Sequence, residues 1–309
     1  MRHLITGGAG FLGSNLIERL IKSNEEIVCM DNFFTGNENN VKSFHKFSNF
    51  KIVNHDVIEP FEINVDKIWH LACPASPTYY QLNPINTART SFLGTYNMLE
   101  LSKKTGAKLL LASSSEIYGN PSVHPQDENY TGSVSTTGLR SCYNEGKRIS
   151  ETLCFDYQRI HNVKICIARI FNSYGPRMQP DDGRVISNFI VQSLKGMNLT
   201  IYGNGEQSRS FCYVDDIIDG LIKLMYSNIM KPVNLGNPYE VKILDLANLI
   251  RKKINPDLSF VYKVLPDEDP LKRKPKILKA REYLNWEPTI SLDNGLDQTI
   301  NYFKNLLKI

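Results

Sequence analysis

The sequence contains few of the features that mark secreted, membrane-spanning or nucleic-acid-binding proteins. Its six cysteines are scattered through 309 residues without a Cys-x-x-Cys pair, so we expect reduced thiols, no disulfide framework and no metal site. No apolar run approaches the ~20 residues that cross a bilayer. Glycines interrupt the first apolar run by Gly7, so no signal peptide is expected. These absences predict a cytoplasmic protein.

The charge and composition are those of an ordinary globular protein. The net charge of +4 is too small to indicate nucleic acid, although it suits a small anionic ligand. Hydrophobic residues make up 41% and charged residues 22% of the chain. A chain of 309 residues is long enough for a large doubly wound domain and a smaller second one.

The first 21 residues predict a strand, a glycine-rich turn and a helix. Residues 3–6 form a short apolar run, and residues 14–21 carry apolar side chains at helical spacing. The intervening glycines satisfy both G-x-G-x-x-G and G-x-x-G-x-x-G. They are Gly7, Gly8, Gly10 and Gly13. Such a turn lets a pyrophosphate approach the backbone and the N-terminus of the helix, so a dinucleotide site is expected here.

The end of the second predicted strand indicates which dinucleotide binds. Residues 26–30 form that strand, and Asp31 ends it. Its carboxylate can accept both ribose hydroxyls and would repel a 2′-phosphate, so NAD is favoured over NADP. The third strand, 50–54, is followed by Asp56 and Val57, where we expect the adenine.

Strands and helices continue to alternate along the chain. Further strands are expected at 67–72, 107–113, 163–170 and 231–236, with a helix at about 86–105. This pattern predicts an α/β protein, a Rossmann-type doubly wound parallel sheet with a smaller C-terminal α/β substrate-binding domain. We expect the two domains to interleave, with 1–170 and 210–236 in the NAD-binding domain and 171–209 and 237–309 in the other.

The order of elements changes after residue 170. Helices are expected at 185–194, at 244–254, up to 284 and at 292–307, and strands at 199–202 and 259–264, with a loop at 266–275. Asp215 is expected to cap a further helix.

Tyr143 and Lys147 lie four residues apart in a predicted helix and therefore share a face. None of the other tyrosines has Lys four residues later. An ammonium group beside a phenol favours the phenolate, so we expect the pKa of Tyr143 to be lowered and the residue to act as an acid or base. Ser114 and Glu116 follow the fifth strand, at the sheet edge where ligands of such folds bind.

Together these motifs resemble the extended short-chain dehydrogenase/reductases that act on nucleotide sugars, and within them the UDP-glucuronate decarboxylase family. The similarity covers essentially the whole chain. Its most specific runs are Pro-Ala-Ser-Pro at 74–77, Ser-Glu-x-Tyr-Gly at 115–119 and Arg-Lys-Pro at 273–275. Other matching runs are 70–73, 83–84, 142–148, 168–172, 174–178, 182–185, 234–238 and 286–288.

The resemblance implies roles for individual residues in an NAD-dependent decarboxylation of UDP-glucuronate to UDP-xylose through a 4-keto sugar. The implied catalytic residues are Tyr143, Lys147, Ser114, Glu116 and Arg273. The cofactor contacts are Gly7, Gly10, Phe11, Leu12, Gly13, Asp31, Asn32, Asp56, Val57, Leu71, Tyr143 and Lys147. The UDP-sugar contacts are Ala75, Tyr80, Arg140, Asn172, Arg184, Tyr202 and Arg209. The sequence does not show which of Glu116 and Arg273 acts on the carboxylate and which on the proton at carbon 5.

The chain departs from the family pattern at three positions near these residues. Leu139 stands where the family usually has proline, Asn144 where aspartate is usual, and Cys73 in place of a small polar residue. These changes affect packing and loop rigidity near the site, so they bear on rate and substrate fit more than on reaction type.

Two alternatives remain open from the sequence. One is another reaction of the same superfamily, namely 4-epimerisation, 4,6-dehydration, or decarboxylation that stops at the 4-keto pentose. Dehydratases typically carry Asp-Glu, and Ser115 lacks that acid. The other is a non-catalytic NAD-binding regulator, which has no chemical need for Ser114, Tyr143 and Lys147. Family resemblance also implies a homodimer formed by helices near 86–105 and 141–161.

Overall fold

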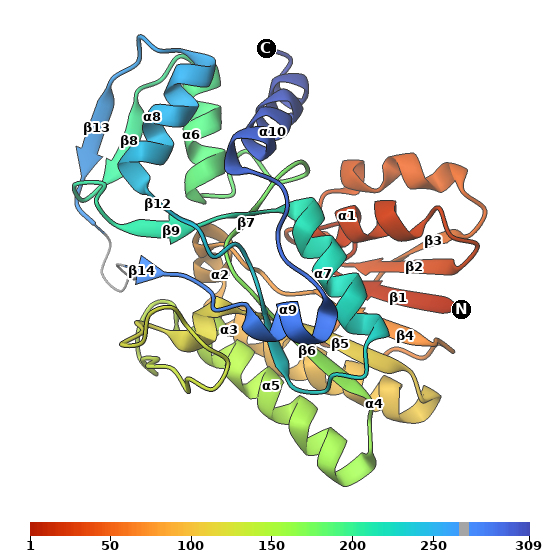
Figure 1. The fold of residues 1–309 in the computed structure, drawn as a ribbon. Helices are drawn as coiled ribbons and strands as arrows, with labels where there is room; N and C mark the ends of the chain where they lie inside the picture. The colour runs from red at the N-terminus through yellow and green to blue at the C-terminus, as the bar shows by residue number, and fades with distance from the viewer. Residues whose placement is uncertain (266–271) are drawn as a thin grey trace.

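A seven-stranded parallel sheet organises the molecule, as the sequence predicts (Figure 1). The computed structural model describes residues 1–265 and 272–309. The strand order is β11-β6-β5-β4-β1-β2-β3. The strands are β1 Arg2–Thr6, β2 Glu26–Asp31, β3 Phe50–Asn54, β4 Lys67–His70, β5 Lys108–Ser114, β6 Ile165–Ile170 and β11 Pro232–Leu235. The doubly wound fold is confirmed.

Helices cover both faces of this sheet because its central strands are apolar on both sides. All six residues of β6 are buried. Helices α1 (Phe11–Leu20) and α7 (Val214–Tyr226) pack together on one face. Helices α4 (Thr95–Thr105) and α5 (Ser141–His161) pack on the other face (Figure 1). The long helix α5 carries Tyr143 and Lys147 in its first two turns.

Two sequence predictions about helices are wrong in detail. The helix expected at 86–105 is interrupted: α3 (Pro84–Arg89) leads into a π-helical turn, η3 (Thr90–Gly94), before α4 begins. Asp215 does not cap α7, because the helix already begins at Val214 and its N-cap, Tyr213, makes no side-chain capping bond.

Most of the remaining elements form a smaller region beyond the carboxyl ends of the large sheet's strands, whereas α9 (Leu278–Leu284) packs against β11 and α7 (Figure 1). Three small sheets have the orders β10-β7, β12-β9-β14 and β13-β8. Their strands are β7 Ser173–Tyr174, β8 Leu199–Tyr202, β9 Ser208–Ser210, β10 Cys212–Tyr213, β12 Glu240–Lys242, β13 Phe260–Lys263 and β14 Lys272–Arg273. The helices are α2 Pro77–Leu82, α6 Val185–Leu194, α8 Ile243–Ile254, α9 Leu278–Leu284 and α10 Leu292–Leu307.

The strand β14 replaces part of the loop predicted at 266–275, and residues 266–271 of that prediction lie outside the described residues. Short 3-10 helices occur at η1 (Glu38–Asn40), η2 (Lys42–Lys46) and η4 (Ser115–Tyr118). The interleaved domain boundaries stay a prediction. In residues 1–265 and 272–309, no helix has the length and apolar character to span a bilayer.

Candidate active site

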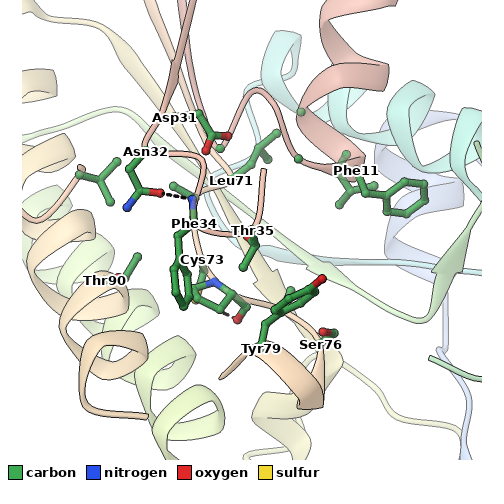
Figure 2. Close-up of a pocket in the computed structure, with 18 of the residues that line it drawn as sticks. Phe11, Asp31, Asn32, Phe34, Thr35, Leu71, Cys73, Ser76, Tyr79 and Thr90 are labelled. Atoms are coloured by element: carbon green, nitrogen blue, oxygen red, sulfur yellow. Dashed lines mark hydrogen bonds between the residues drawn. The ribbon is translucent and has the colours of Figure 1, made fainter. Parts of the chain in front are cut away.

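A cleft lies at the carboxyl ends of β1, β2 and β4, and the small region closes its other side. Figure 2 shows Phe11, Asp31, Leu71 and Ser76 around it. Ten of the twelve residues predicted to contact the cofactor line this cleft. They are Gly7, Gly10, Phe11, Leu12, Gly13, Asp31, Asn32, Asp56, Val57 and Leu71. The structure therefore brings these ten predicted residues together. The other two, Tyr143 and Lys147, are buried on α5.

The glycine turn leaves the N-terminus of α1 open to this cleft. The helix begins at Phe11, three residues earlier than the apolar spacing predicts, and its N-cap Gly10 makes no side-chain capping bond. Gly7 has φ +68°, a left-handed conformation that favours glycine. The N–H groups of the first helical turn therefore remain available to a phosphate, which fits a dinucleotide.

Gly13 is required by the packing of this turn. A Cβ at Gly13 would lie 2.2 Å from the carbonyl oxygen of Gly7 and 2.7 Å from the Cα of Gly8. We expect Gly13→Ala to destabilise the protein by about 1–3 kcal/mol, because the turn must shift to accept the methyl group. Thermal unfolding and titration with NAD would measure the loss of stability and of cofactor affinity. Arg19→Ala, an exposed change on the same helix, is the control and should alter neither.

Asp31 is anchored by the backbone of two loops. Its Oδ2 accepts from the Ala9 N–H at 2.9 Å, and its Oδ1 accepts from the Phe33 N–H at 2.8 Å. Burial raises the pKa of its carboxyl, and these backbone hydrogen bonds act in the opposite direction. A carboxylate has about four acceptor positions, so Asp31 retains capacity for a ribose hydroxyl besides these backbone donors.

Ser76 is a cleft residue that the sequence reasoning missed. It lies within the Pro-Ala-Ser-Pro run, in which Ala75 alone was assigned a contact. Its Oγ is buried and has no hydrogen-bond partner in the part of the chain that the structure describes. A buried hydroxyl without a partner costs free energy, so this atom is suited to a ligand. Cys73 and Thr90 also line the cleft (Figure 2).

Ser114 and Tyr143 meet beside this cleft, with Lys147 one turn further along α5. Lys147 Nζ lies 5.8 Å from the centre of the Tyr143 ring and donates to the carbonyl oxygen of Ala112 at 2.8 Å. Tyr80 also stacks on Tyr143, with ring centres 5.2 Å apart and planes 8° apart. The phenol is thereby held between fixed neighbours.

The expected lowering of the Tyr143 pKa is wrong in this structure. Burial raises the pKa of the phenol well above its usual range, and nearby Cys73 and Glu116 act in the same direction. A hydrogen bond with Ser114 acts against them. The sequence shows that Lys147 shares a helix face with Tyr143. It does not show how strongly burial penalises a phenolate, nor that Ala112 accepts a hydrogen bond from the ammonium.

Glu116 and Arg273, 157 positions apart in the chain, form a buried ion pair. Arg140 Nη2 also donates to Glu116 Oε1 at 2.9 Å. Burial alone would raise the pKa of Glu116, but the positive charges of Arg273, Arg140 and Arg209 outweigh it and lower the pKa. Glu116 is therefore held as a carboxylate.

Arg273 has hydrogen-bonding capacity left over. The residue is 3% exposed, and its Nε is buried without an acceptor among residues 1–265 and 272–309. Its Nη2 donates to Glu116 Oε2 and to the carbonyl oxygen of Gly119, both at 3.3 Å. A buried guanidinium with an unused donor suits an anionic ligand.

The other residues expected to contact the UDP-sugar are spread over several elements. Arg184 and Ala75 line the cleft. Arg184 forms an ion pair with Asp182 at 2.5 Å and lies 5.5 Å from the Phe11 ring. Tyr202 is 40% exposed at the end of β8.

Two further residues from that prediction, Arg209 and Asn172, lie in or next to the small sheets. Arg209 lies in β9, paired in register with Arg273, and its charge contributes to the low pKa of Glu116. The backbone carbonyl of Asn172 accepts a hydrogen bond from the Cys212 N–H at 2.9 Å. The predicted contacts of these residues with the sugar stay predictions.

Comparison with known proteins assigns the chain to a family whose name matches the dinucleotide cleft described above. Residues 3–236 match the NAD dependent epimerase/dehydratase family. Among solved structures, the chain is similar to the UDP-glucose 4-epimerase of Thermotoga maritima with UDP-glucose, at 28% identity and a TM-score of 0.91 over 99% of this chain and 100% of that one. The chain belongs to the NAD dependent epimerase/dehydratase family.

More similar sequences narrow the assignment within that family. The chain is 52% identical to UDP-glucuronic acid decarboxylase 1 of Xenopus tropicalis, over 99% of this chain and 73% of that protein. It is 52% identical to UDP-glucuronic acid decarboxylase 3 of Arabidopsis thaliana, over 96% of this chain and 87% of that protein. These identities place it with the UDP-glucuronic acid decarboxylases. A UDP-glucuronic acid 4-epimerase of Bacillus cereus, solved with UDP-glucuronic acid and NAD, is 28% identical, with a TM-score of 0.89 over 99% of this chain and 100% of that one.

Proposed function

We propose that this protein catalyses the NAD-dependent decarboxylation of UDP-glucuronate to UDP-xylose through a 4-keto intermediate. The observation that carries the proposal is the buried pair of Glu116 and Arg273 beside Ser114 and Tyr143. Oxidation of a sugar hydroxyl requires a tyrosine and a serine of this kind. A substrate that carries a carboxylate also calls for a cation that can position it, and the partly unsatisfied guanidinium of Arg273 is suited to that role.

In the oxidation step, Tyr143 takes the proton of the sugar's 4-hydroxyl, which requires that the positive charges of Lys147 and bound NAD⁺ bring down the pKa that burial raises. Ser114 hydrogen-bonds the same oxygen, and Lys147 holds a ribose and provides positive charge beside the phenol. Bound NAD would supply the redox chemistry, accepting hydride from carbon 4 and later returning it to that carbon. No external oxidant is consumed, because the hydride returns at each turnover.

The ketone at carbon 4 makes the adjacent carboxylate easy to lose. The carboxyl group is on carbon 5, so the oxidised sugar is a β-keto acid, and departure of CO₂ leaves an enolate that the ketone stabilises. A proton that comes ultimately from water is then added at carbon 5, and the proton held by Tyr143 returns to oxygen 4 when the hydride returns to carbon 4. We propose that Arg273 orients the departing carboxylate and that Glu116, an ionised partner of Arg273 and Arg140, fixes the guanidinium groups.

The test is a mass spectrum of the nucleotide sugar after purified protein has been incubated with UDP-glucuronate and a catalytic amount of NAD. We expect loss of CO₂ without net NADH. Loss of CO₂ and two hydrogens, with NADH accumulating, would show that the 4-keto pentose is released. An unchanged mass would contradict decarboxylation. Separation of UDP-glucuronate from its 4-epimer would then test the activity named for the structurally similar epimerase.

We also propose that the protein is a cytoplasmic homodimer. All six cysteines are free thiols, which suits a reducing compartment. Apolar side chains are exposed on the helices that the sequence analysis assigns to the dimer. They are Phe92, Tyr96, Ile149 and Ile160. Light scattering of the purified protein would test the dimer.

A further inference from the structure

A buried glutamine, Gln126, joins the loop after Glu116 to the segment that carries Arg273. Gln126 is 0% exposed. Its N–H donates to the carbonyl oxygen of Lys274 at 2.8 Å, and its carbonyl oxygen accepts from the Lys276 N–H at 2.8 Å. These bonds make a parallel bridge between Gln126 and Pro275. The backbone beside Arg273 is therefore fixed in register with Gln126.

The side chain of Gln126 strengthens the same junction. Its Oε1 accepts from the Lys274 N–H at 2.8 Å, so the residue next to Arg273 is bound through both its N–H and its carbonyl group. Its Nε2 donates to the carbonyl oxygen of Val123 at 2.7 Å, which fixes the amide within its own loop. An apolar side chain of similar size would leave the Lys274 N–H without this acceptor.

A second buried amide supports the junction from behind. Asn234 Nδ2 donates to the carbonyl oxygens of Gln126 at 3.1 Å and Lys276 at 3.2 Å. Its Oδ1 accepts from the Tyr118 hydroxyl at 2.8 Å. Tyr118 Oη in turn accepts from Arg169, which pairs with Glu151 at 2.8 Å. The junction is thus connected to η4, which carries Glu116, and to β6 and α5 of the large sheet layer.

We propose that Gln126 is a positioning residue for the decarboxylation step and that it holds Arg273 in place against Glu116. The inference rests on the proposed function and assigns to it a residue outside the ion pair. Arg273 lies on the two-residue strand β14, whose partner in the sheet is β9. Such a short strand fixes few backbone groups by itself, so the hydrogen bonds to Gln126 set the position of the Arg273 guanidinium.

The oxidation step does not depend on this junction. Ser114 ends β5, and Tyr143 and Lys147 lie on α5, so both elements are held by sheet and helix bonds that do not pass through Gln126. Loss of the Gln126 side chain should therefore slow the loss of CO₂ while oxidation at carbon 4 continues. A purely structural role would lower both steps together.

The experiment compares Gln126→Met with the parent protein in two assays with UDP-glucuronate. In single turnovers, NADH absorbance reports oxidation, and mass spectrometry reports UDP-xylose. We expect UDP-xylose formation to fall about a hundredfold, because small misplacements of a catalytic group cost that much. NADH formation should stay within about threefold, and the keto sugar should accumulate. Ser122→Ala, an exposed change in the same loop, is the matched control and should match the parent in both assays.

A double mutant separates positioning from general damage. If Gln126 acts through Arg273, Gln126→Met should lower UDP-xylose formation by less than about threefold further in an Arg273→Ala background. The proposal would be overturned if the effects of the two substitutions multiply in the double mutant. It would also be overturned if Gln126→Met alone lowers NADH and UDP-xylose formation equally, or forms UDP-xylose at the parent rate. If Gln126→Met fails to fold, Gln126→Asn, whose shorter side chain cannot reach Lys274, tests the same predictions. Failure of the parent itself to form UDP-xylose would instead reject the proposed function.

Discussion

Replacing Tyr143 with phenylalanine is expected to lower the rate of UDP-xylose formation by about 10³-fold, within the range for loss of a general acid–base group. The ring would remain stacked on Tyr80, so the site should keep its shape while losing the hydroxyl that we propose takes the proton. Because oxidation comes first, single-turnover NADH formation should fall by the same factor. The measurement is stopped-flow absorbance combined with product mass.

Tyr157→Phe is the matched control for this change. Tyr157 lies on the same helix, and its hydroxyl donates to Glu100 Oε1. Its loss should leave turnover within about twofold of the parent, because a partly exposed hydrogen bond contributes only about 0.5–1.5 kcal/mol to stability. If Tyr143→Phe retains more than a tenth of the parent rate, Tyr143 is not the base.

Removal of the Arg273 guanidinium should separate oxidation from decarboxylation. For Arg273→Ala we expect UDP-xylose formation to fall at least ~10²-fold, because a positioned cation for the departing carboxylate is lost. NADH should still form in a single turnover, since Ser114 and Tyr143 are unchanged. Glu116 keeps Arg140 as a partner, which limits the cost of leaving its charge buried.

Lys272→Ala controls for loss of a positive charge on the same short strand. Lys272 is exposed, whereas Arg273 is buried. The Lys272→Ala protein should therefore form NADH and UDP-xylose at rates close to those of the parent. An Arg273→Ala protein that makes UDP-xylose at the parent rate would rule out the proposed role of the ion pair. Equal loss of NADH and UDP-xylose would place Arg273 in substrate binding instead.

Much of the cofactor cleft could be predicted because its residues are close in sequence to recognisable strand ends. The glycine run follows β1, and Asp31 ends β2, so the rule that ligands bind at the carboxyl ends of parallel strands locates both. All ten predicted residues outside α5 line one cleft. The spacing of Tyr143 and Lys147 likewise predicts a shared helix face, because that relation is local.

The parts that could not be predicted depend on long-range packing and burial. The spacing of Glu116 and Arg273 in the sequence does not predict that they pair. Only the family resemblance assigns both residues to the active site. Nothing in the local sequence marks Gln126, whose role comes from a bridge to Pro275. The predicted direction of the Tyr143 pKa shift was wrong because burial, which a helix pattern does not reveal, raises the pKa of the phenol.

The position of Arg273 in the chain has a consequence for how the two steps of the proposed reaction can be altered separately. The family match ends at residue 236, after β11 has completed the large sheet, whereas Arg273 lies beyond it on β14. Within our proposal, the residues that make the ketone lie inside that match, and Arg273, which positions the carboxylate, lies outside it. A change confined to the short strand β14 would then alter the loss of CO₂ and leave the residues that exchange hydride unchanged.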